Sequence, residues 1–143
     1  MQTSIIEEVR VFNRFYTDFI GLLNQYLLDS AYSLTEARII YEIFTAGNIQ
    51  ASQIMEIMHI DKSYLSRILK RLEKEGIIEK RKSIQDARGI TITLSKKGRQ
   101  VFEHLNRASN EQVEKLLTPL KSTEAEALAF HMKAIVKILK VHS

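Results

Sequence analysis

Cysteine is absent from the 143 residues of this chain, and proline occurs only once. Without cysteine the protein has no disulfide, no thiolate ligand for zinc or iron–sulfur clusters, and no cysteine nucleophile or thiol redox sensor. No apolar run approaches the roughly 20 residues that a membrane-spanning helix requires. The charged residues Glu7, Glu8 and Arg10 stand where a secretory signal keeps an unbroken apolar core. These absences predict a cytoplasmic protein.

Residues that break helices are also scarce, because Pro119 and five glycines make up the whole set. Long helices are therefore expected. A hydrophobic content of 45% in a chain of this length is typical of one globular domain with a sizeable core. No two of the four histidines stand three or four residues apart, as metal ligands on one helix face do. We expect neither a metal site nor a cofactor.

The segment 61–76 has the periodicity of an amphipathic helix. At about 100° per residue its apolar positions fall on one stripe. This stripe consists of Leu65, Ile68, Leu69 and Leu72. The opposite side and its flanks are polar and mostly basic, with Ser63, Tyr64, Ser66, Arg67, Lys70, Arg71 and Lys74. Such a helix has one face for a core and another for an anion, which in a small soluble protein is most often a nucleic acid.

Charge is concentrated around this helix. Residues 51–100 contain twelve Lys or Arg against six Asp or Glu, a net charge of +6, whereas the rest of the chain has a net charge of −2. A basic third in an otherwise acidic chain is expected if one face meets phosphates. The alternative is a charged run that only solvates a surface. A basic helix followed at once by a basic hairpin favours nucleic acid.

Local signals divide the centre of the chain into short elements. Ser33 and Glu36 have the spacing of a capping box and begin a helix. Residues 51–58 form a short helix, and Asp61 is a good N-cap for the basic helix. Gly76 supplies a left-handed C-cap after it.

A hairpin and three long helices complete the pattern. The β-branched runs 77–81 and 90–94 predict two strands, joined by a tip over 83–89. Ser95 caps a helix that continues to about Leu117. The chain begins with an amphipathic helix over about 4–28. Its last helix is expected to begin at a second capping box, formed by Thr123 and Glu126.

This order of elements predicts a mainly α fold with a small β-wing. A winged helix–turn–helix spans about 33–99 as the DNA-binding lobe of a single domain, 1–143. The helices over about 1–30 and 100–143 have more apolar surface than so small a lobe covers. We expect them to be dimerisation helices that pack against a second copy of the chain. The alternative is an intramolecular bundle.

Four motifs follow one another at characteristic spacing. They are Leu34-Thr35, Leu72-Glu73-Lys74-Glu75-Gly76-Ile77-Ile78, Asp86-Ala87-Arg88, and Thr91-Ile92-Thr93-Leu94-Ser95-Lys96-Lys97-Gly98-Arg99. In this order they resemble the MarR family of bacterial transcriptional regulators over nearly the full chain. The family's wing has Asp-x-Arg, alternating apolar residues, then Leu-Thr-x-x-Gly. Ser95 takes the place of the usual Thr, which preserves helix capping.

A narrower resemblance involves the segments 9–16, 33–38 and 64–69. They look like the regulator half of proteins that fuse a MarR-like domain to a C-terminal N-acetyltransferase. The chain ends at Ser143 without room for that second domain, so no acetyltransferase activity is expected. No nucleophile–base set or paired-carboxylate motif indicates another enzyme.

The resemblance implies a homodimer on double-stranded DNA with a pseudo-palindromic operator. Two basic helices would enter successive major grooves, and the wings would reach the flanking minor grooves. The candidates for bases and nearby phosphates are Ser63, Tyr64, Ser66, Arg67 and Lys70. Arg67 is central and suited to a bidentate contact with guanine. Arg71 is expected to meet phosphate or solvent, and Tyr64 has packing at the helix edge as an alternative.

At the wing, Arg88 resembles the family arginine that enters the minor groove, and Asp86 would brace the tip. The alternative for this pair is a purely structural turn. Arg81, Lys82 and Gln85 are candidates for phosphate contacts or solvated strand residues.

The resemblance also implies a possible small-molecule effector, often an aromatic acid, between the dimer helices and the DNA-binding lobe. The candidate lining residues are Phe12, Tyr16, Phe19, Arg38 and Tyr41. The alternative is ordinary core or dimer packing of these aromatic side chains.

The leading hypothesis is a dimeric, sequence-specific transcriptional regulator that acts as a repressor. The competing hypothesis is a winged-helix protein-interaction module, in which the basic face docks an acidic partner.

Overall fold

The fold is mainly helical with one small sheet, as the sequence predicts. The computed structural model describes residues 2–27, 31–82 and 89–141. The helices are α1 (Thr3–Leu27), α2 (Leu34–Ala46), α3 (Ala51–Met58), α4 (Lys62–Lys74), α5 (Lys96–Leu117) and α6 (Ser122–Val141). The strands are β1 (Ile49–Gln50), β2 (Ile78–Lys82) and β3 (Ile90–Leu94). The chain divides into two compact units, Met1–Ala108 and Ser109–Ser143.

The sheet is antiparallel, with the strand order β1-β3-β2. Ile78 pairs with Leu94 across the hairpin, and Ile49 of β1 pairs with Ile92. The hairpin strands confirm the sequence prediction. The pattern did not predict β1, because a strand of two residues is too short to show alternation.

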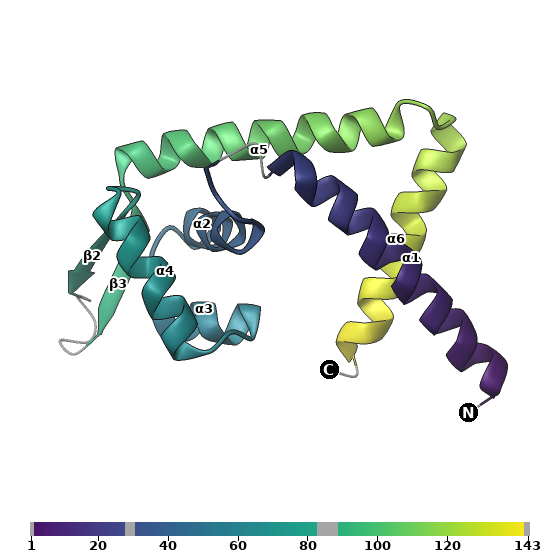
Figure 1. Cartoon of the computed structure of the whole chain (residues 1–143), viewed down its shortest axis with the longest axis horizontal. Coiled ribbons are helices and arrows are strands. Elements are labelled where there is room, and N and C mark those ends of the chain that lie inside the picture. The colour runs from purple at the N-terminus through teal and green to yellow at the C-terminus, as the bar shows by residue number, and fades with distance from the viewer. Residues whose placement is uncertain (1, 28–30, 83–88, 142–143) are drawn as a thin grey trace. The chain divides into compact units, whose positions relative to one another are not determined.

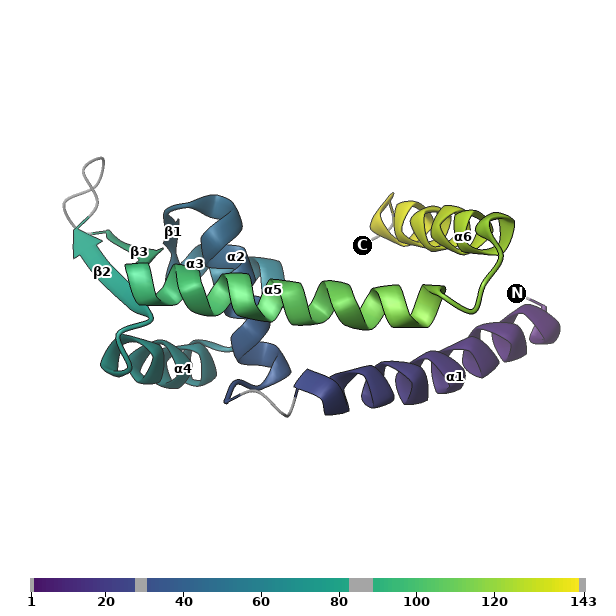
Figure 2. The ribbon, with the colours of Figure 1, turned by 90° about the horizontal axis from the view of Figure 1, so that it is seen from above.

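One hydrophobic core lies in the first unit. Figures 1 and 2 show α2, α3 and α4 gathered beside β2, β3 and the first turns of α5. The core is made of side chains that are 9% exposed or less: Ile39, Ile40, Ile43, Ile49, Ile54, Leu65, Ile68, Leu69, Leu72, Ile77, Ile78, Ile92, Leu94, Phe102 and Leu105. The whole apolar stripe predicted for α4 is therefore buried.

Caps determine where most of these helices begin and end. The Ser33 hydroxyl accepts from the Glu36 N–H at 3.2 Å, and the Glu36 carboxylate accepts from the Ser33 N–H at 3.0 Å. Asp61 accepts from the Tyr64 N–H at 2.8 Å. Gly76 has φ of +76° beyond the end of α4, in the left-handed region that costs glycine least. These three predictions are confirmed.

The predicted start of α6 is wrong by a short distance. The helix begins at Ser122, so Lys121 and not Thr123 stands at its N-cap. The Lys121 N–H donates to the carboxylate of Glu124 at 3.0 Å. An acidic side chain in the first turn thus satisfies a backbone donor without a hydroxyl at the N-cap.

An ion pair joins α4 to the beginning of α2. Nη1 of Arg71 donates to Oε2 of Glu36 at 2.7 Å, and the Glu36 side chain is 7% exposed. Arg71 also donates to the carbonyl oxygen of Ala31 at 3.3 Å and to the carboxylate of Glu75 at 3.2 Å. A carboxylate buried to this degree is costly unless it is paired. The pair therefore helps to hold α4 against α2.

The first and last helices expose much of their apolar surface. On α1, Phe15 is 65% exposed; α6 contains no buried residue, and its Phe130 and Ile138 are 69% and 63% exposed. Of the helices in the described residues, none is long and apolar enough to cross a membrane. These exposed stripes are the feature from which dimerisation is inferred below.

Substitution of Gly98 tests the packing of α5 on the hairpin. A Cβ atom at Gly98 would overlap the carbonyl oxygen of Ile77 and lie 3.3 Å from Cβ of Leu94. We expect Gly98→Ala to lower the free energy of unfolding by about 1–3 kcal/mol, because the backbone must shift. Urea unfolding measures the change. Gln100→Ala on the exposed side of the same helix is the control, and an equal effect in both variants would contradict the close-approach argument.

A double-mutant cycle tests the ion pair between Arg71 and Glu36. Arg71→Met should lower the thermal midpoint by several degrees, because it leaves a buried carboxylate without its charged partner. Adding Glu36→Gln should restore part of the loss, since the amide still accepts from the Ser33 N–H. Circular dichroism follows unfolding. Strictly additive effects of the two substitutions would show that the pair is not coupled.

Candidate nucleic-acid interface

α3 and α4 form the helix–turn–helix, and the turn between them is set by local backbone chemistry. His59 ends α3 in the left-handed region, with φ of +54°. Asp61 then caps α4, so three residues connect the two helices. With its apolar stripe buried, α4 presents its polar side to solvent.

The outward side of α4 carries the predicted base-contacting residues. Ser63, Tyr64, Arg67 and Lys70 are exposed, and Ser66 is half-buried. The guanidinium carbon of Arg67 lies 5.9 Å from the centroid of the Tyr64 ring. A cation at this distance is attracted to the ring face. The structure therefore brings these five candidates together on one helix, with Arg67 held near Tyr64.

Arg71 lies at the edge of this face and is engaged within the protein. Its hydrogen bond with Glu75, and then the charges of Glu36 and Glu75, raise the pKa of Arg71 above its ordinary value. The neighbouring Tyr32 is partly buried, which together with Glu75 raises the pKa of its hydroxyl. The geometry favours a positioning role for Arg71, and its contact with phosphate stays a prediction.

The hairpin separates its charged residues between two faces. Lys80 lies 3.8 Å from the carboxylate of Glu73 on α4, so this side of β2 faces α4. Because side chains alternate along a strand, Lys82 shares that side while Glu79 and Arg81 lie on the other. Nη2 of Arg81 donates to Glu79 at 3.2 Å. The remaining wing candidates, Gln85, Asp86 and Arg88, lie outside the described residues.

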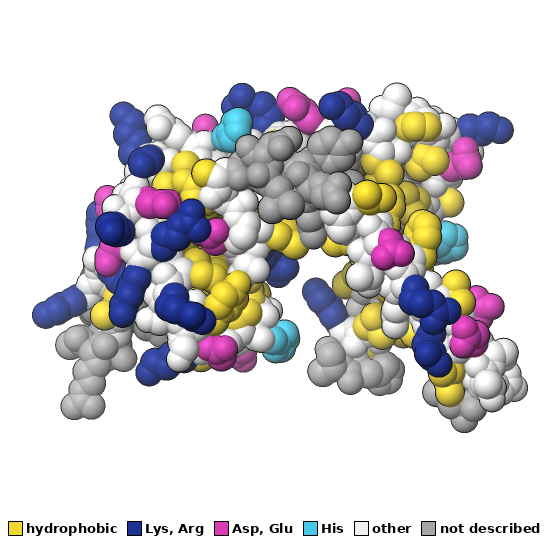
Figure 3. Space-filling model, in the orientation of Figure 1, with side chains coloured by type: hydrophobic (Ala, Val, Ile, Leu, Met, Phe, Trp, Pro, Cys, Tyr) yellow, Lys and Arg dark blue, Asp and Glu magenta, His cyan; other side chains and the backbone are white. Residues whose placement is uncertain are grey.

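The lobe has the electrostatics of an anion-binding surface. Figure 3 shows Lys and Arg side chains gathered over α4 and the hairpin. Carboxylates are interspersed there, and several are paired, as Glu73 is with Lys80. The cations on the outward side of α4, Arg67 and Lys70, have no carboxylate partner among the described residues. Exposed and unpaired cations of this kind are suited to phosphate and base-edge contacts.

The predicted effector residues form two separate groups of contacts. On α1, the rings of Phe12 and Tyr16 stack at 5.4 Å, and those of Tyr16 and Phe19 at 6.2 Å. On α2, Arg38 pairs with Glu42 at 2.7 Å, and the ring of Tyr41 lies 6.4 Å from that of Phe102 on α5. Within the described residues no hydrogen bond, ion pair or ring contact joins one group to the other. A shared effector pocket stays a prediction.

Two features of the lobe were not predicted from the sequence. The first is the Arg71–Glu36 pair, because residues so far apart in the chain leave no local pattern. The second is a pocket on the side of the hairpin away from α4, which is considered below. The described part of the chain holds no cluster of three His, Asp or Glu side chains that could bind a metal ion.

Comparisons with known proteins identify the lobe and the fold. The MarR family model matches residues 32–90. The multiple antibiotic resistance protein MarR of Salmonella typhimurium is 28% identical over 116 residues, which are 80% of this chain and 81% of that protein. The HTH-type transcriptional regulator BilQ of Clostridium symbiosum is 27% identical over 63% of this chain and 62% of its own length.

Solved structures share the fold over most of the chain. FabT of Streptococcus pneumoniae, in complex with DNA, superposes with a TM-score of 0.79 at 22% identity, covering 94% of this chain and 99% of that one. A MarR mutant from E. coli, complexed with operator DNA, superposes with a TM-score of 0.73 at 22% identity, covering 92% and 95%. This chain therefore has a winged helix–turn–helix fold, and its residues 32–90 are similar to the MarR family.

Proposed function

We propose that this protein is a homodimeric transcriptional regulator that binds double-stranded DNA at a pseudo-palindromic operator. The observation that carries the proposal is the outward side of α4, which joins unpaired cations to hydrogen-bonding side chains on a helix anchored by its buried stripe. A helix of this width fits the major groove. BilQ is named as a transcriptional regulator, and the FabT and E. coli MarR structures that share this fold contain DNA, which supports the same function.

Each part of the lobe has a separate task in this proposal. Arg67 reads a base edge in the major groove, where its guanidinium suits the two acceptors of guanine. Lys70 and Lys82 meet phosphates, which position the protein without reading sequence. Arg88, in the family's wing motif, enters the flanking minor groove.

The exposed apolar stripes of α1 and α6 support the homodimer. Monomeric proteins rarely expose large contiguous apolar patches, and a two-fold dimer buries the same patch on both chains. Two copies of α4 are then held at a fixed distance, as successive major grooves require. Repression, with release by a small aromatic acid, is the form of regulation that we propose for this dimer.

Substitution of Arg67 tests base readout. The operator is first selected from genomic fragments that the purified protein retains. We expect Arg67→Ala to weaken operator binding by about 1–3 kcal/mol and to relax the preference at one base pair. Equal loss on operator and random DNA would assign Arg67 to phosphate contact instead. Absence of duplex binding even at low salt would favour the protein-interaction module and overturn the proposal.

Lys70→Ala is the matched variant from the same helix face. It should weaken binding to all sequences alike and reduce the slope of log affinity against log salt by about 1. Fluorescence anisotropy titrations over a salt series measure both quantities. An unchanged slope would remove Lys70 from the phosphate contacts.

Sedimentation tests the dimer. The wild-type protein should sediment at about twice the 16.5 kDa of one chain. Ile138→Glu should shift it toward the mass of one chain, because the carboxylate would be buried in an apolar interface. Lys137→Glu introduces the same group one position away as the control. A dimer that tolerates Ile138→Glu would exclude this part of α6 from the interface.

A further inference from the structure

A polar pocket lies on the side of the hairpin that faces away from α4. It has a volume of about 380 Å³ and is lined by Asn48, Glu79, Arg81, Thr93, Leu94, Ser95, Lys96 and Arg99. The alternation of β2 separates it from α4, since Lys80 faces α4 while Glu79 and Arg81 line the pocket. This pocket is therefore distinct from the α4 surface proposed for base contacts.

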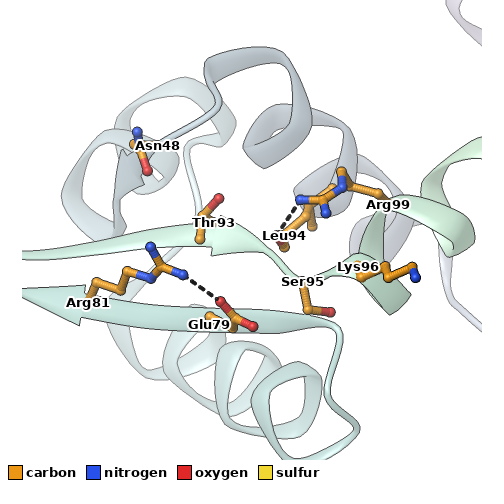
Figure 4. Close-up of a pocket in the computed structure, with 8 residues that line it drawn as sticks. All are labelled: Asn48, Glu79, Arg81, Thr93, Leu94, Ser95, Lys96 and Arg99. Atoms are coloured by element: carbon orange, nitrogen blue, oxygen red, sulfur yellow. Dashed lines mark hydrogen bonds and ion pairs between the residues drawn. The ribbon is translucent and has the colours of Figure 1, made fainter.

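The pocket lining has an excess of positive charge. Three cations line it, Arg81, Lys96 and Arg99, against the single carboxylate of Glu79. Figure 4 shows the guanidinium groups of Arg81 and Arg99 on the sides of these residues that face each other, while the Lys96 side chain extends away from both. Glu79 engages only one nitrogen of Arg81, at 3.2 Å. The other N–H groups of that guanidinium have no partner among the described residues.

The start of α5 adds a second, independent feature. The N-terminus of a helix carries partial positive charge, so acidic residues are favoured in the first turn. α5 has no acidic residue there and instead carries Lys96, Lys97 and Arg99. Lys97 is engaged with the carbonyl oxygen of Glu75 at 2.8 Å, which leaves Lys96 and Arg99 beside the pocket. The positive charges of Lys96 and Arg99 repel the partial positive charge of the helix N-terminus. An anion bound in the pocket would reduce this repulsion.

Donors for the oxygens of such an anion are in place. Arg99 reaches the carbonyl oxygen of Leu94 only at 3.4 Å, so its guanidinium is weakly engaged. Within the described residues, the side chains of Asn48 and Thr93 have no hydrogen-bond partner. Ser95 is already committed, because its hydroxyl donates to the Gly76 carbonyl and accepts from the Gly98 N–H. Two guanidinium groups, an amide and a hydroxyl thus converge on one hollow.

We propose that this pocket binds a phosphate group. Paired guanidinium groups match the geometry and charge of phosphate oxygens. The volume is within the range of about 300–1,000 Å³ typical of small-molecule sites, so it admits more than inorganic phosphate alone. The phosphate belongs either to a small phosphorylated molecule or to the DNA backbone beside the wing. The pyrophosphate titration uses no DNA, so phosphate binding is tested apart from the proposed operator binding; only the assignment to the DNA backbone rests on that proposed function.

Calorimetric titration with pyrophosphate and with inorganic phosphate, at constant ionic strength, tests the site. The test variant carries Lys96→Gln and Arg99→Gln. The control carries Arg107→Gln and Lys115→Gln, which remove the same charge from exposed positions of the same helix. We expect saturable binding to the wild type and the control, and about tenfold weaker binding to the test variant, because charge-assisted donors are lost. Circular dichroism verifies that all three proteins are folded.

Operator titrations with the same proteins identify the source of the phosphate. Weaker operator binding in the test variant than in the control assigns the pocket to the DNA backbone. Weaker pyrophosphate binding with operator affinity equal to the control assigns it to a small phosphorylated molecule. The proposal is overturned if test and control variants bind both pyrophosphate and operator equally, or if the wild type binds no phosphate and the two variants bind the operator alike.

Discussion

A single buried carboxylate ties α4 to the start of α2. One oxygen of Glu36 accepts from the Ser33 N–H at 3.0 Å and closes the capping box of α2, while the other accepts from Arg71 at 2.7 Å. The same guanidinium reaches the carbonyl oxygen of Ala31. The start of α2, Ala31 before it and α4 are therefore joined through the Glu36–Arg71 pair. The proposed reading of bases by α4 needs this restraint, because base contacts require placement to within a fraction of a hydrogen-bond length.

The turn after α4 has a comparable effect on the hairpin. The Ile77 N–H donates to the Leu72 carbonyl at 2.9 Å, and the Gly76 N–H donates to that of Glu73 at 3.0 Å. These bonds fix the residue at which β2 begins, and hence which side of the strand each charge occupies. A shift of one residue would place Glu79 and Arg81 against α4 and turn Ile78 outward. The proposed separation of a DNA-facing side from a phosphate pocket follows from this register.

The parts of the fold that were predictable from sequence are those with local causes. The capping box at Ser33, the N-cap Asp61, the C-cap glycine and the buried stripe of α4 each arise from residues a few positions apart. Features that join distant residues were not predictable, since β1 exists only through its pairing with Ile92 and the Arg71–Glu36 pair needs two helices in contact. The predicted start of α6 is wrong for a different reason. Two overlapping patterns are present, Thr123 with Glu126 and Lys121 with Glu124, and the structure forms the second, in which the Lys121 N–H donates to the Glu124 carboxylate.

Two arginines of α4 have different roles, because Arg71 is bound within the protein while Arg67 is exposed. Arg71 donates to two carboxylates and a carbonyl oxygen. Its substitution is therefore expected to disturb the placement of α4 first, and any change in DNA binding would follow from that. In the part of the chain that the structure describes, Arg67 has the Tyr64 ring nearby, at 5.9 Å, and no carboxylate partner. That contact limits the conformations of the free side chain and so would lower the entropy lost in the proposed contact with a base edge. Lysine has one nitrogen in place of the three with which Arg71 reaches Glu75, Glu36 and Ala31, and it has no planar guanidinium to pair with guanine, so neither position is expected to accept it.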